Sequence, residues 1–156
     1  MVAILHNIRS LHNVGSIFRT ADAAGLEKLY LTGVTPAPVD RFGHLRPQLG
    51  KVALGAQEYV PWEKVASPTR AIRSLKERDF SIVGVEQTQK AVPYYSFPKA
   101  RDRKRLAILL GNERRGLPAS LLQKCDTILV IPMRGKKESL NVSVVFGIVV
   151  FHLLHG

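Results

Sequence analysis

Two polar loops in the C-terminal third carry side chains suited to binding and catalysis. Residues 111–118 (GNERRGLP) follow the apolar run Leu106–Leu110, and residues 133–141 (MRGKKESLN) follow the apolar run Ile128–Ile131. Glu113 in the first loop can orient an arginine, while arginine side chains bind phosphate through paired hydrogen bonds. The second loop adds the hydroxyl of Ser139 and the amide of Asn141. These groups can hydrogen-bond to a ligand, so the two loops are candidates for a binding or catalytic site.

The apolar runs before the two loops predict strands. Both runs are short, continuous and bounded by Gly or Pro, which is typical of strands buried on both faces of a parallel sheet. Ligands of such sheets bind at the carboxyl ends of the strands. We therefore expect the two loops to form one site.

A third polar segment lies near the N-terminus. The predicted strand Val2–Leu5 leads into residues 6–13, which are rich in hydrogen-bond donors, and Asn13 is a natural N-cap. Val14, Ile17, Phe18 and Ala21 then predict one apolar helical face that ends at Gly25. Arg19 lies about 100° from Phe18 on this helix and can point towards the preceding loop.

The rest of the chain predicts an α/β fold with a mostly parallel sheet in a single domain over residues 1–156. We expect strands at Lys28–Thr32, around Glu58–Val60 and at Phe80–Val85, a helix from Pro68 to about Arg78 capped by Ser67, and one or two helical turns within Pro118–Cys125. Prolines and glycines break up residues 33–56, which form either a functional loop or a mobile connection.

The last segment, Val142–Leu154, is apolar at almost every position. Its length and the polar residues before it favour a helix capped by Asn141, although its β-branched residues favour a strand. A helix that is apolar all round must be buried on every side. A dimer interface would supply that burial.

The net charge of +11 favours a polyanionic partner, although an inert basic surface would give the same composition. The basic segment 98–105 is either a solvated face or a phosphate contact. The longest apolar run is too short to span a bilayer, and the single cysteine fits a reducing compartment. These features predict a soluble, cytoplasmic protein.

Several other chemistries lack their sequence signatures. The five histidines show no metal-binding spacing, so we expect no metal site. No dinucleotide fingerprint or P-loop is present, which argues against a Rossmann-type oxidoreductase. Tyr94, Tyr95 and Phe97 could stack on nucleobases, but we favour a place in the core.

Three ordered motifs resemble those of the SpoU (TrmH-type) RNA ribose 2'-O-methyltransferases. They are Asn7, Arg9 and residues 13–21 (NVGSIFRTA), residues 112–118 (NERRGLP), and residues 131–143 (IPMRGKKESLNVS). The resemblance implies the SPOUT fold with a C-terminal trefoil knot, a homodimer through the C-terminal helix, and methyl transfer from S-adenosylmethionine to a ribose 2'-hydroxyl of tRNA or rRNA. It also implies roles for residues in all three motifs.

The implied residues fall into three overlapping groups. The cofactor-binding residues would be Leu110, Gly111, Ile131, Met133, Ser139 and Leu140. The catalytic residues would be Arg19, Asn13, Glu113, Ser139 and Asn141. The RNA-binding residues would be Asn7, Arg9, Arg19, Arg41, Arg46, Arg114 and Arg115.

Family proposals assign activation of the 2'-hydroxyl to the arginine that matches Arg19. A guanidinium group stays protonated in proteins, so a phosphate clamp that also orients the hydroxyl is physically easier than a general base. For Glu113, a surface pair with Arg114 or Arg115 is the alternative to a role in the site.

The alternative to catalysis is a non-catalytic RNA-binding or ribosome-assembly factor with the same fold. Many family members have an extra N-terminal RNA-binding domain, whereas this sequence begins at the first predicted strand. We therefore expect the methyltransferase domain, a partner subunit or another protein to recognise the RNA.

Overall fold

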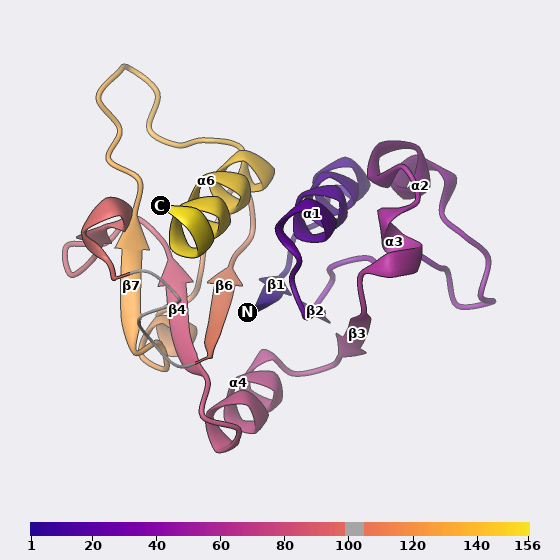
Figure 1. The fold of residues 1–156 in the computed structure, drawn as a ribbon, viewed down its shortest axis with the longest axis horizontal. Helices are drawn as coiled ribbons and strands as arrows, with labels where there is room; N and C mark the ends of the chain where they lie inside the picture. The colour runs from indigo at the N-terminus through magenta and orange to yellow at the C-terminus, as the bar shows by residue number, and fades with distance from the viewer. Residues whose placement is uncertain (99–104) are drawn as a thin grey trace.

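A parallel seven-stranded sheet forms the centre of the protein (Figure 1). The computed structural model describes residues 1–98 and 105–156, so most of the basic segment 98–105 lies outside the described residues. The strands follow the order β3-β2-β1-β6-β4-β7-β5, and every neighbouring pair is parallel. Their bounds are β1 Val2–His6, β2 Lys28–Thr32, β3 Trp62–Val65, β4 Ser81–Val85, β5 Val92–Pro93, β6 Leu106–Leu110 and β7 Thr127–Val130.

Helices cover both faces of the sheet. Their bounds are α1 Leu11–Ala24, α2 Pro47–Ala53, α3 Ala56–Tyr59, α4 Pro68–Glu77, α5 Ala119–Leu122 and α6 Val142–His155, with a 3₁₀ turn, η1, at Tyr94–Ser96. In Figure 1, α1 and α6 lie on one side of the sheet and α4 on the other. The predicted α/β class and parallel sheet are confirmed.

Two apolar clusters fill the space between the sheet and the helices. Alternate strand residues, such as Leu5 and Ile108, pack with α1 and α6. The residues between them, such as Ile4 and Leu109, pack with α4 and α5. Successive side chains of a strand point to opposite faces, so continuous apolar strands serve both clusters at once.

Helix α1 begins earlier than predicted. Its N-cap is Ser10, whose Oγ accepts a hydrogen bond from the Asn13 backbone N–H at 3.1 Å. The prediction that Asn13 is the cap was wrong, because serine and asparagine cap equally well and Ser10 lies three residues upstream. The predicted apolar face is buried, and Gly25 ends the helix with φ 67°. The earlier start leaves the Asn13 side chain available for other contacts.

The segment 33–61 contains more regular structure than predicted. Helix α2 begins at Pro47, and the short helix α3 occupies Ala56–Tyr59, where we had expected a strand. The strand of this region begins after Pro61 instead, as β3, and pairs with β2. A proline cannot donate to a sheet ladder, so the pairing starts at Trp62.

The C-terminal segment is a helix, as its length favoured, and Asn141 is its N-cap. One side of α6 is buried by Phe146, Val149 and Leu153, among others, while Val144 and Phe151 are exposed by 48% and 41%. The predicted core position of Tyr95 is wrong, since this side chain is exposed, whereas Phe97 is buried. Within the described residues no helix has the length and hydropathy to cross a membrane.

Candidate active site

A cavity of about 290 Å³ opens at the carboxyl edge of the sheet, where β6, β4 and β7 end next to one another. Both polar loops of the C-terminal third line it, together with the start of α6. The predicted convergence of the two loops is confirmed. Carboxyl ends of neighbouring parallel strands meet at one edge, so the convergence follows from the sheet order.

All six residues predicted to bind a cofactor line this cavity: Leu110, Gly111, Ile131, Met133, Ser139 and Leu140. Leu110 and Gly111 are buried, whereas Ser139 and Leu140 are exposed at the rim. Ile131 is partly buried, since it packs against the first apolar cluster while it lines the cavity. Strand-end backbone groups and apolar side chains together suit a ligand with an aromatic ring.

Sequence reasoning missed the residues at the carboxyl end of β4 and immediately after it. Val85, Glu86 and Gln87 line the cavity because β4 lies between β6 and β7. Glu86 holds the first loop in place, since its Oε2 accepts from the Leu117 backbone N–H at 2.8 Å. The predicted strand Phe80–Val85 could have indicated these residues, because its carboxyl end lies at the same edge of the parallel sheet as the ends of the two strands that lead into the polar loops.

The first loop folds tightly beside the cavity. Asn112 and Gly116 form an antiparallel bridge, and the Gly116 N–H donates to the Asn112 carbonyl at 2.9 Å. A Cβ atom on Gly111 would lie 2.6 Å from the backbone carbon of Gly116. A glycine is therefore required at position 111, because the opposing atoms are backbone and cannot move away as a side chain would.

A chain of hydrogen bonds joins Asn141, Asn13 and Glu113, one residue from each motif. Asn141 Oδ1 accepts from the Ser143 backbone N–H at 2.9 Å, so the amide Nδ2 faces Asn13 and donates to its Oδ1 at 3.1 Å. Asn13 Nδ2 in turn donates to Glu113 Oε1 at 3.2 Å. The helix cap thus fixes the direction of every bond in the chain.

Glu113 accepts hydrogen bonds from amides and pairs with no arginine in residues 1–98 or 105–156. Besides Asn13, the backbone N–H groups of Ser10 and Arg9 donate to it at 3.3 and 3.4 Å. Both predicted pairings of Glu113 with an arginine were therefore wrong. Burial raises the pKa of Glu113, but hydrogen bonds from its own backbone N–H, Asn13, Ser10 and Arg9 outweigh burial and lower it overall.

Arg19 is exposed on α1, and no hydrogen bond or ion pair joins it to another described residue. It lies six residues beyond Asn13, about 9 Å along the helix axis. Arg19 is therefore separate from the Asn141–Asn13–Glu113 chain, and its guanidinium remains available to an external ligand. Ser139 lines the cavity but is likewise not part of this chain.

Asn7 connects the ends of β1 and β2. Its Oδ1 accepts from the Val34 N–H at 3.0 Å, so its Nδ2 donates to His6 Nε2, also at 3.0 Å. His6 must then carry its proton on Nδ1, which donates to Thr32 Oγ1 at 3.0 Å. Burial lowers the pKa of His6, in keeping with a neutral ring. Asn7 thus has a structural role, and RNA binding by its side chain stays a prediction.

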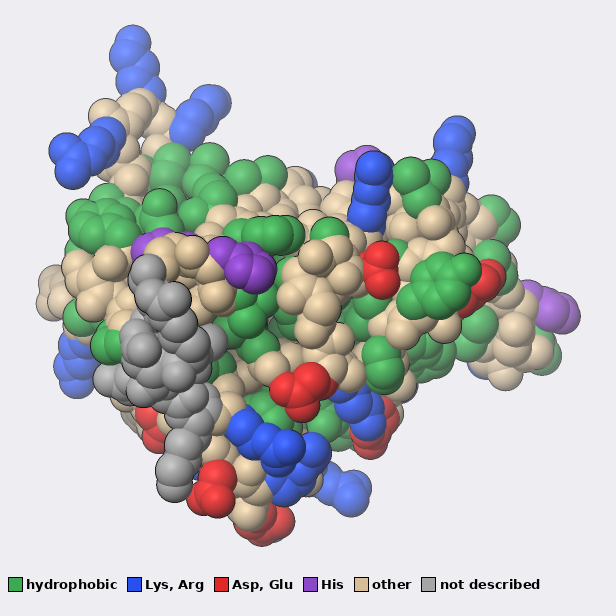
Figure 2. All heavy atoms as spheres, in the orientation of Figure 1, with side chains coloured by type: hydrophobic (Ala, Val, Ile, Leu, Met, Phe, Trp, Pro, Cys, Tyr) green, Lys and Arg blue, Asp and Glu red, His purple; other side chains and the backbone are tan. Residues whose placement is uncertain are grey.

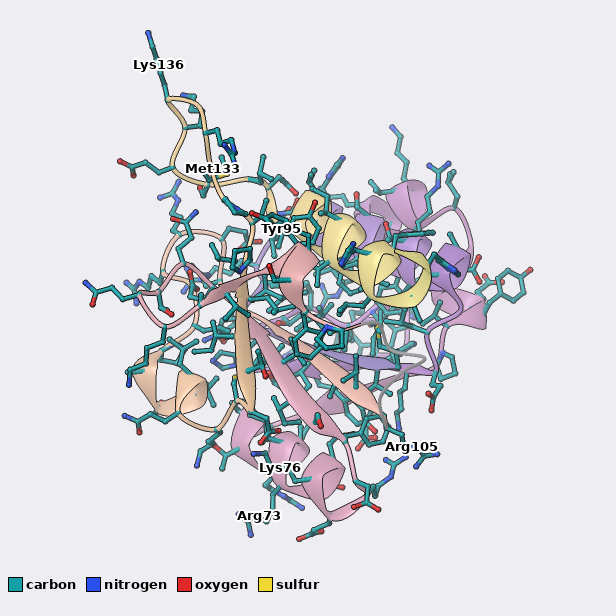
Figure 3. All side chains as sticks on the ribbon, turned by 60° about the vertical axis from the view of Figure 1, so that its left-hand side comes forward. Arg73, Lys76, Tyr95, Arg105, Met133 and Lys136 are labelled. Carbon is teal, nitrogen blue, oxygen red and sulfur yellow. The ribbon has the colours of Figure 1, made fainter. Side chains whose placement is uncertain are left out.

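The arginines predicted to bind RNA fall into two places. Arg9, Arg114 and Arg115 are exposed in the loops beside the cavity, whereas Arg41 and Arg46 lie in the segment between β2 and α2. Sequence reasoning did not include Arg134, Lys136 and Lys137, which are exposed on the loop after β7. Figure 2 shows Lys and Arg side chains projecting where Figure 1 draws this loop, and Figure 3 places Lys136 at its tip.

The cavity itself is more acidic than the protein as a whole. Glu86, Glu113 and Glu138 line it, and among the described residues Arg114 is its one basic lining residue, although the chain carries a net charge of +11. Carboxylates disfavour a ligand with several phosphates and favour one with a positive centre. No group of three metal-ligating side chains occurs in the described parts of the chain.

Comparisons with known proteins agree with the motifs and the fold. The chain is 36% identical over 148 residues to the 23S rRNA (guanosine-2'-O-)-methyltransferase RlmB of Escherichia coli, covering 95% of this chain and 57% of RlmB. The AdoMet-bound rRNA methyltransferase of Sinorhizobium meliloti superimposes with a TM-score of 0.86 at 28% identity, covering 97% of this chain and 54% of that one. The TrmH/SpoU tRNA modifying enzyme of A. aeolicus gives a TM-score of 0.83 at 28% identity, covering 97% and 72%.

The chain thus spans a little over half the length of the curated relatives it matches. Threading of the C-terminal segment into a trefoil knot stays a prediction. The model of the SpoU rRNA Methylase family matches residues 1–151, nearly the whole chain, and the chain belongs to this family.

Proposed function

We propose that this protein binds S-adenosylmethionine in the cavity and methylates a ribose 2'-hydroxyl of tRNA or rRNA. One observation carries the proposal: the six residues that the family resemblance assigns to the cofactor all line a single cavity, and Asn13, Glu113 and Asn141 are joined at its rim. The names of the relatives support both substrate classes, since RlmB is named for 23S rRNA and the A. aeolicus enzyme for tRNA.

The cavity fits this cofactor chemically. Ile131 and Leu140 offer apolar surface for the adenine ring, and Glu86 and Glu138 offer negative charge for a positively charged ligand. When bound, S-adenosylmethionine supplies a methyl group on a positively charged sulfur, which the ribose 2'-oxygen accepts with loss of its proton. Gly111 lets the first loop close against the end of β6, because a Cβ there would lie 2.6 Å from the Gly116 backbone carbon.

The residues outside the cavity hold the RNA. Arg19, exposed and free of partners among the described residues, clamps a phosphate and orients the hydroxyl towards the cavity. A guanidinium stays protonated, so the hydroxyl proton leaves to a phosphate oxygen or to water rather than to Arg19. Asn13, held by Glu113 and Asn141, fixes the loop over which the ribose lies.

The proposal is tested with methyl-labelled S-adenosylmethionine and separate pools of unmodified tRNA and 23S rRNA. We expect a labelled 2'-O-methyl nucleoside from one pool. Arg19→Ala should keep cofactor affinity, measured by calorimetry, and lose most of the transfer. Arg73→Ala is the matched control, because Arg73 is an exposed arginine on α4, on the far side of the molecule from Met133 (Figure 3).

Normal turnover of Arg19→Ala would remove Arg19 from the mechanism. Cofactor binding by the wild-type protein without transfer to either pool would favour the non-catalytic RNA-binding reading. Absence of cofactor binding would refute the proposed role of the cavity.

We also propose a homodimer through α6 and a single domain over residues 1–156. Val144 and Phe151 leave apolar surface exposed on α6, beside η1, where the Tyr94 ring lies 5.0 Å from that of His152. Exposed Tyr95 extends this surface (Figure 3). Light scattering should give twice the monomer mass, and Phe151→Lys should reduce the measured mass to that of the monomer. An unchanged mass would refute α6 as the interface.

For the single domain, one unfolding transition is expected because both apolar clusters share one sheet.

A further inference from the structure

The segment between β2 and α2 forms an ordered hairpin with an aromatic tip. Val39 and Leu45 form an antiparallel bridge, and Asp40 Oδ1 accepts from the backbone N–H groups of Phe42 and His44 at 2.8 and 3.0 Å. Gly43 takes φ 81° and closes the turn. Part of the segment predicted to be a functional loop or a mobile connection therefore forms a hydrogen-bonded hairpin.

Phe42 is exposed at the tip of this hairpin, with 68% of its surface accessible. The Arg41 guanidinium lies 4.8 Å from its ring centroid, and the His44 ring lies 6.2 Å away. A single exposed apolar residue is ordinary on protein surfaces. Here, however, hydrogen bonds to Asp40 hold the backbone of the turn, and the ring stays largely accessible although a guanidinium lies over it.

The hairpin stands on the same edge of the sheet as the cavity. It follows the carboxyl end of β2, and β2, β1, β6 and β4 are consecutive strands. Three strand spacings, about 14 Å, therefore separate the carboxyl end of β2 from that of β4, which lines the cavity. Lys64 holds the chain where it leaves β2, since its Nζ donates to the Gly33 carbonyl at 2.6 Å and to the Thr35 carbonyl. Figure 1 draws the hairpin projecting beyond α2.

We propose that Phe42 stacks on an unpaired base of the RNA substrate, several nucleotides from the methylated ribose. This inference rests on the proposed function for the identity of the RNA. An aromatic ring beside cations is the arrangement with which proteins bind single-stranded nucleic acid, because every base has a π-face and the backbone is anionic. Arg41 and His44 flank the ring, and Arg46 follows at the foot of the hairpin.

The test compares binding of a labelled single-stranded RNA of about 16 nucleotides with that of an RNA duplex of equal charge. Phe42→Ala should weaken single-strand binding by about 5-fold to 150-fold, the range that one base stack represents, and leave duplex binding unchanged. Phe42→Leu should behave as Phe42→Ala, because it keeps apolar surface but no ring. Phe42→Trp should keep affinity and show fluorescence quenching on RNA addition.

Tyr59→Ala is the matched control. Tyr59 is 74% exposed on α3, which precedes β3 and so lies at the opposite edge of the sheet. Its removal should leave RNA affinity unchanged. Arg41→Ala should reduce the slope of log affinity against log salt by about 1, whereas Phe42→Ala should leave that slope unaltered.

Wild-type affinity of Phe42→Ala, equal losses on single strand and duplex, or full rescue by Phe42→Leu would each overturn the proposal. If Phe42→Ala folds poorly, absence of quenching in Phe42→Trp overturns it instead. Methyl transfer separates this inference from the proposed function. Transfer that survives Phe42→Ala with an unchanged KM for RNA refutes the stacking alone, whereas Phe42-dependent binding without any transfer refutes only the activity.

Discussion

Asn141 has two separable tasks, and substitution should distinguish them. Its Oδ1 caps α6 through Ser143, and its Nδ2 donates to Asn13. Loss of an N-cap costs about 1 kcal/mol, and loss of one hydrogen bond costs about 1 kcal/mol more. Asn141→Ala should therefore lower the free energy of unfolding by about 2 kcal/mol, which corresponds to a Tm lower by about 4–8 °C.

Asn141→Ser and Asn141→Asp both keep a capping oxygen and lose the bond to Asn13. Serine is too short to cap the helix and reach Asn13 together, so about 1 kcal/mol should be lost. The carboxylate of Asn141→Asp would face Asn13 Oδ1, and rotating the Asn13 amide would only turn that oxygen towards Glu113. We therefore expect Asn141→Asp to be less stable than Asn141→Ser, although aspartate is a good N-cap.

Urea unfolding followed by circular dichroism measures these differences. Ser67→Ala is the control for a cap alone, since Ser67 caps α4 by accepting from the Arg70 N–H, far from the cavity. A cycle with Asn13→Ala should give a coupling energy of about 1 kcal/mol between Asn13 and Asn141. Equal stability of Asn141→Ser, Asn141→Asp and wild type would show that the bond to Asn13 contributes nothing and refute the reasoning.

Two further predictions concern the cavity and the end of β1. Gly111→Ala should weaken S-adenosylmethionine binding at least tenfold in calorimetry, because its Cβ would lie 2.6 Å from the Gly116 backbone. The control is Gly135→Ala, which should bind the cofactor normally because the space around Gly135 is open. Equal affinities of the two variants would contradict the close packing at Gly111. The folded-state pKa of His6 lies below the unfolded value near 6.5, so the unfolded protein binds more protons and stability is full above that pH. Urea unfolding should show stability falling as pH drops below 6.5, by up to about 1.4 kcal/mol per unit, and His6→Gln should flatten this fall. An unchanged slope in His6→Gln would assign the fall to other groups.

The elements that form the cavity were predictable because their physical signals are local. Leu106–Leu110 is continuously apolar, and its sheet position buries both of its faces. Ser67 and Pro68 mark the start of α4 in the way that capping requires. The start of α1 was missed because Ser10 and Asn13 are both good caps, and the apolar positions that follow fit either start.

Side-chain partners were less predictable than elements. The sequence indicates that Glu113 lies in a polar loop, and opposite charges nearby suggest an arginine pair. The structure instead gives it backbone N–H groups more than one hundred positions earlier in the chain. Every non-proline residue carries such a donor, so no residue type marks these partners in the sequence. Their identity depends on β1 and β6 being neighbours, which only the strand order determines.

Strand order also explains why residues of three distant motifs act together. Asn13 follows β1 and Glu113 follows β6, and because these strands are adjacent, the two side chains meet across one strand spacing. Asn141 is the N-cap of α6, which packs with α1 on the same face of the sheet. The Asn141 side chain therefore lies close enough to Asn13 to donate a hydrogen bond to it. Asn13 is buried and uses both atoms of its amide, so a partner lost on either side would leave a buried polar group unpaired. The geometry of the proposed ribose site therefore depends on contacts among all three motifs, and a substitution in one should be felt in the other two.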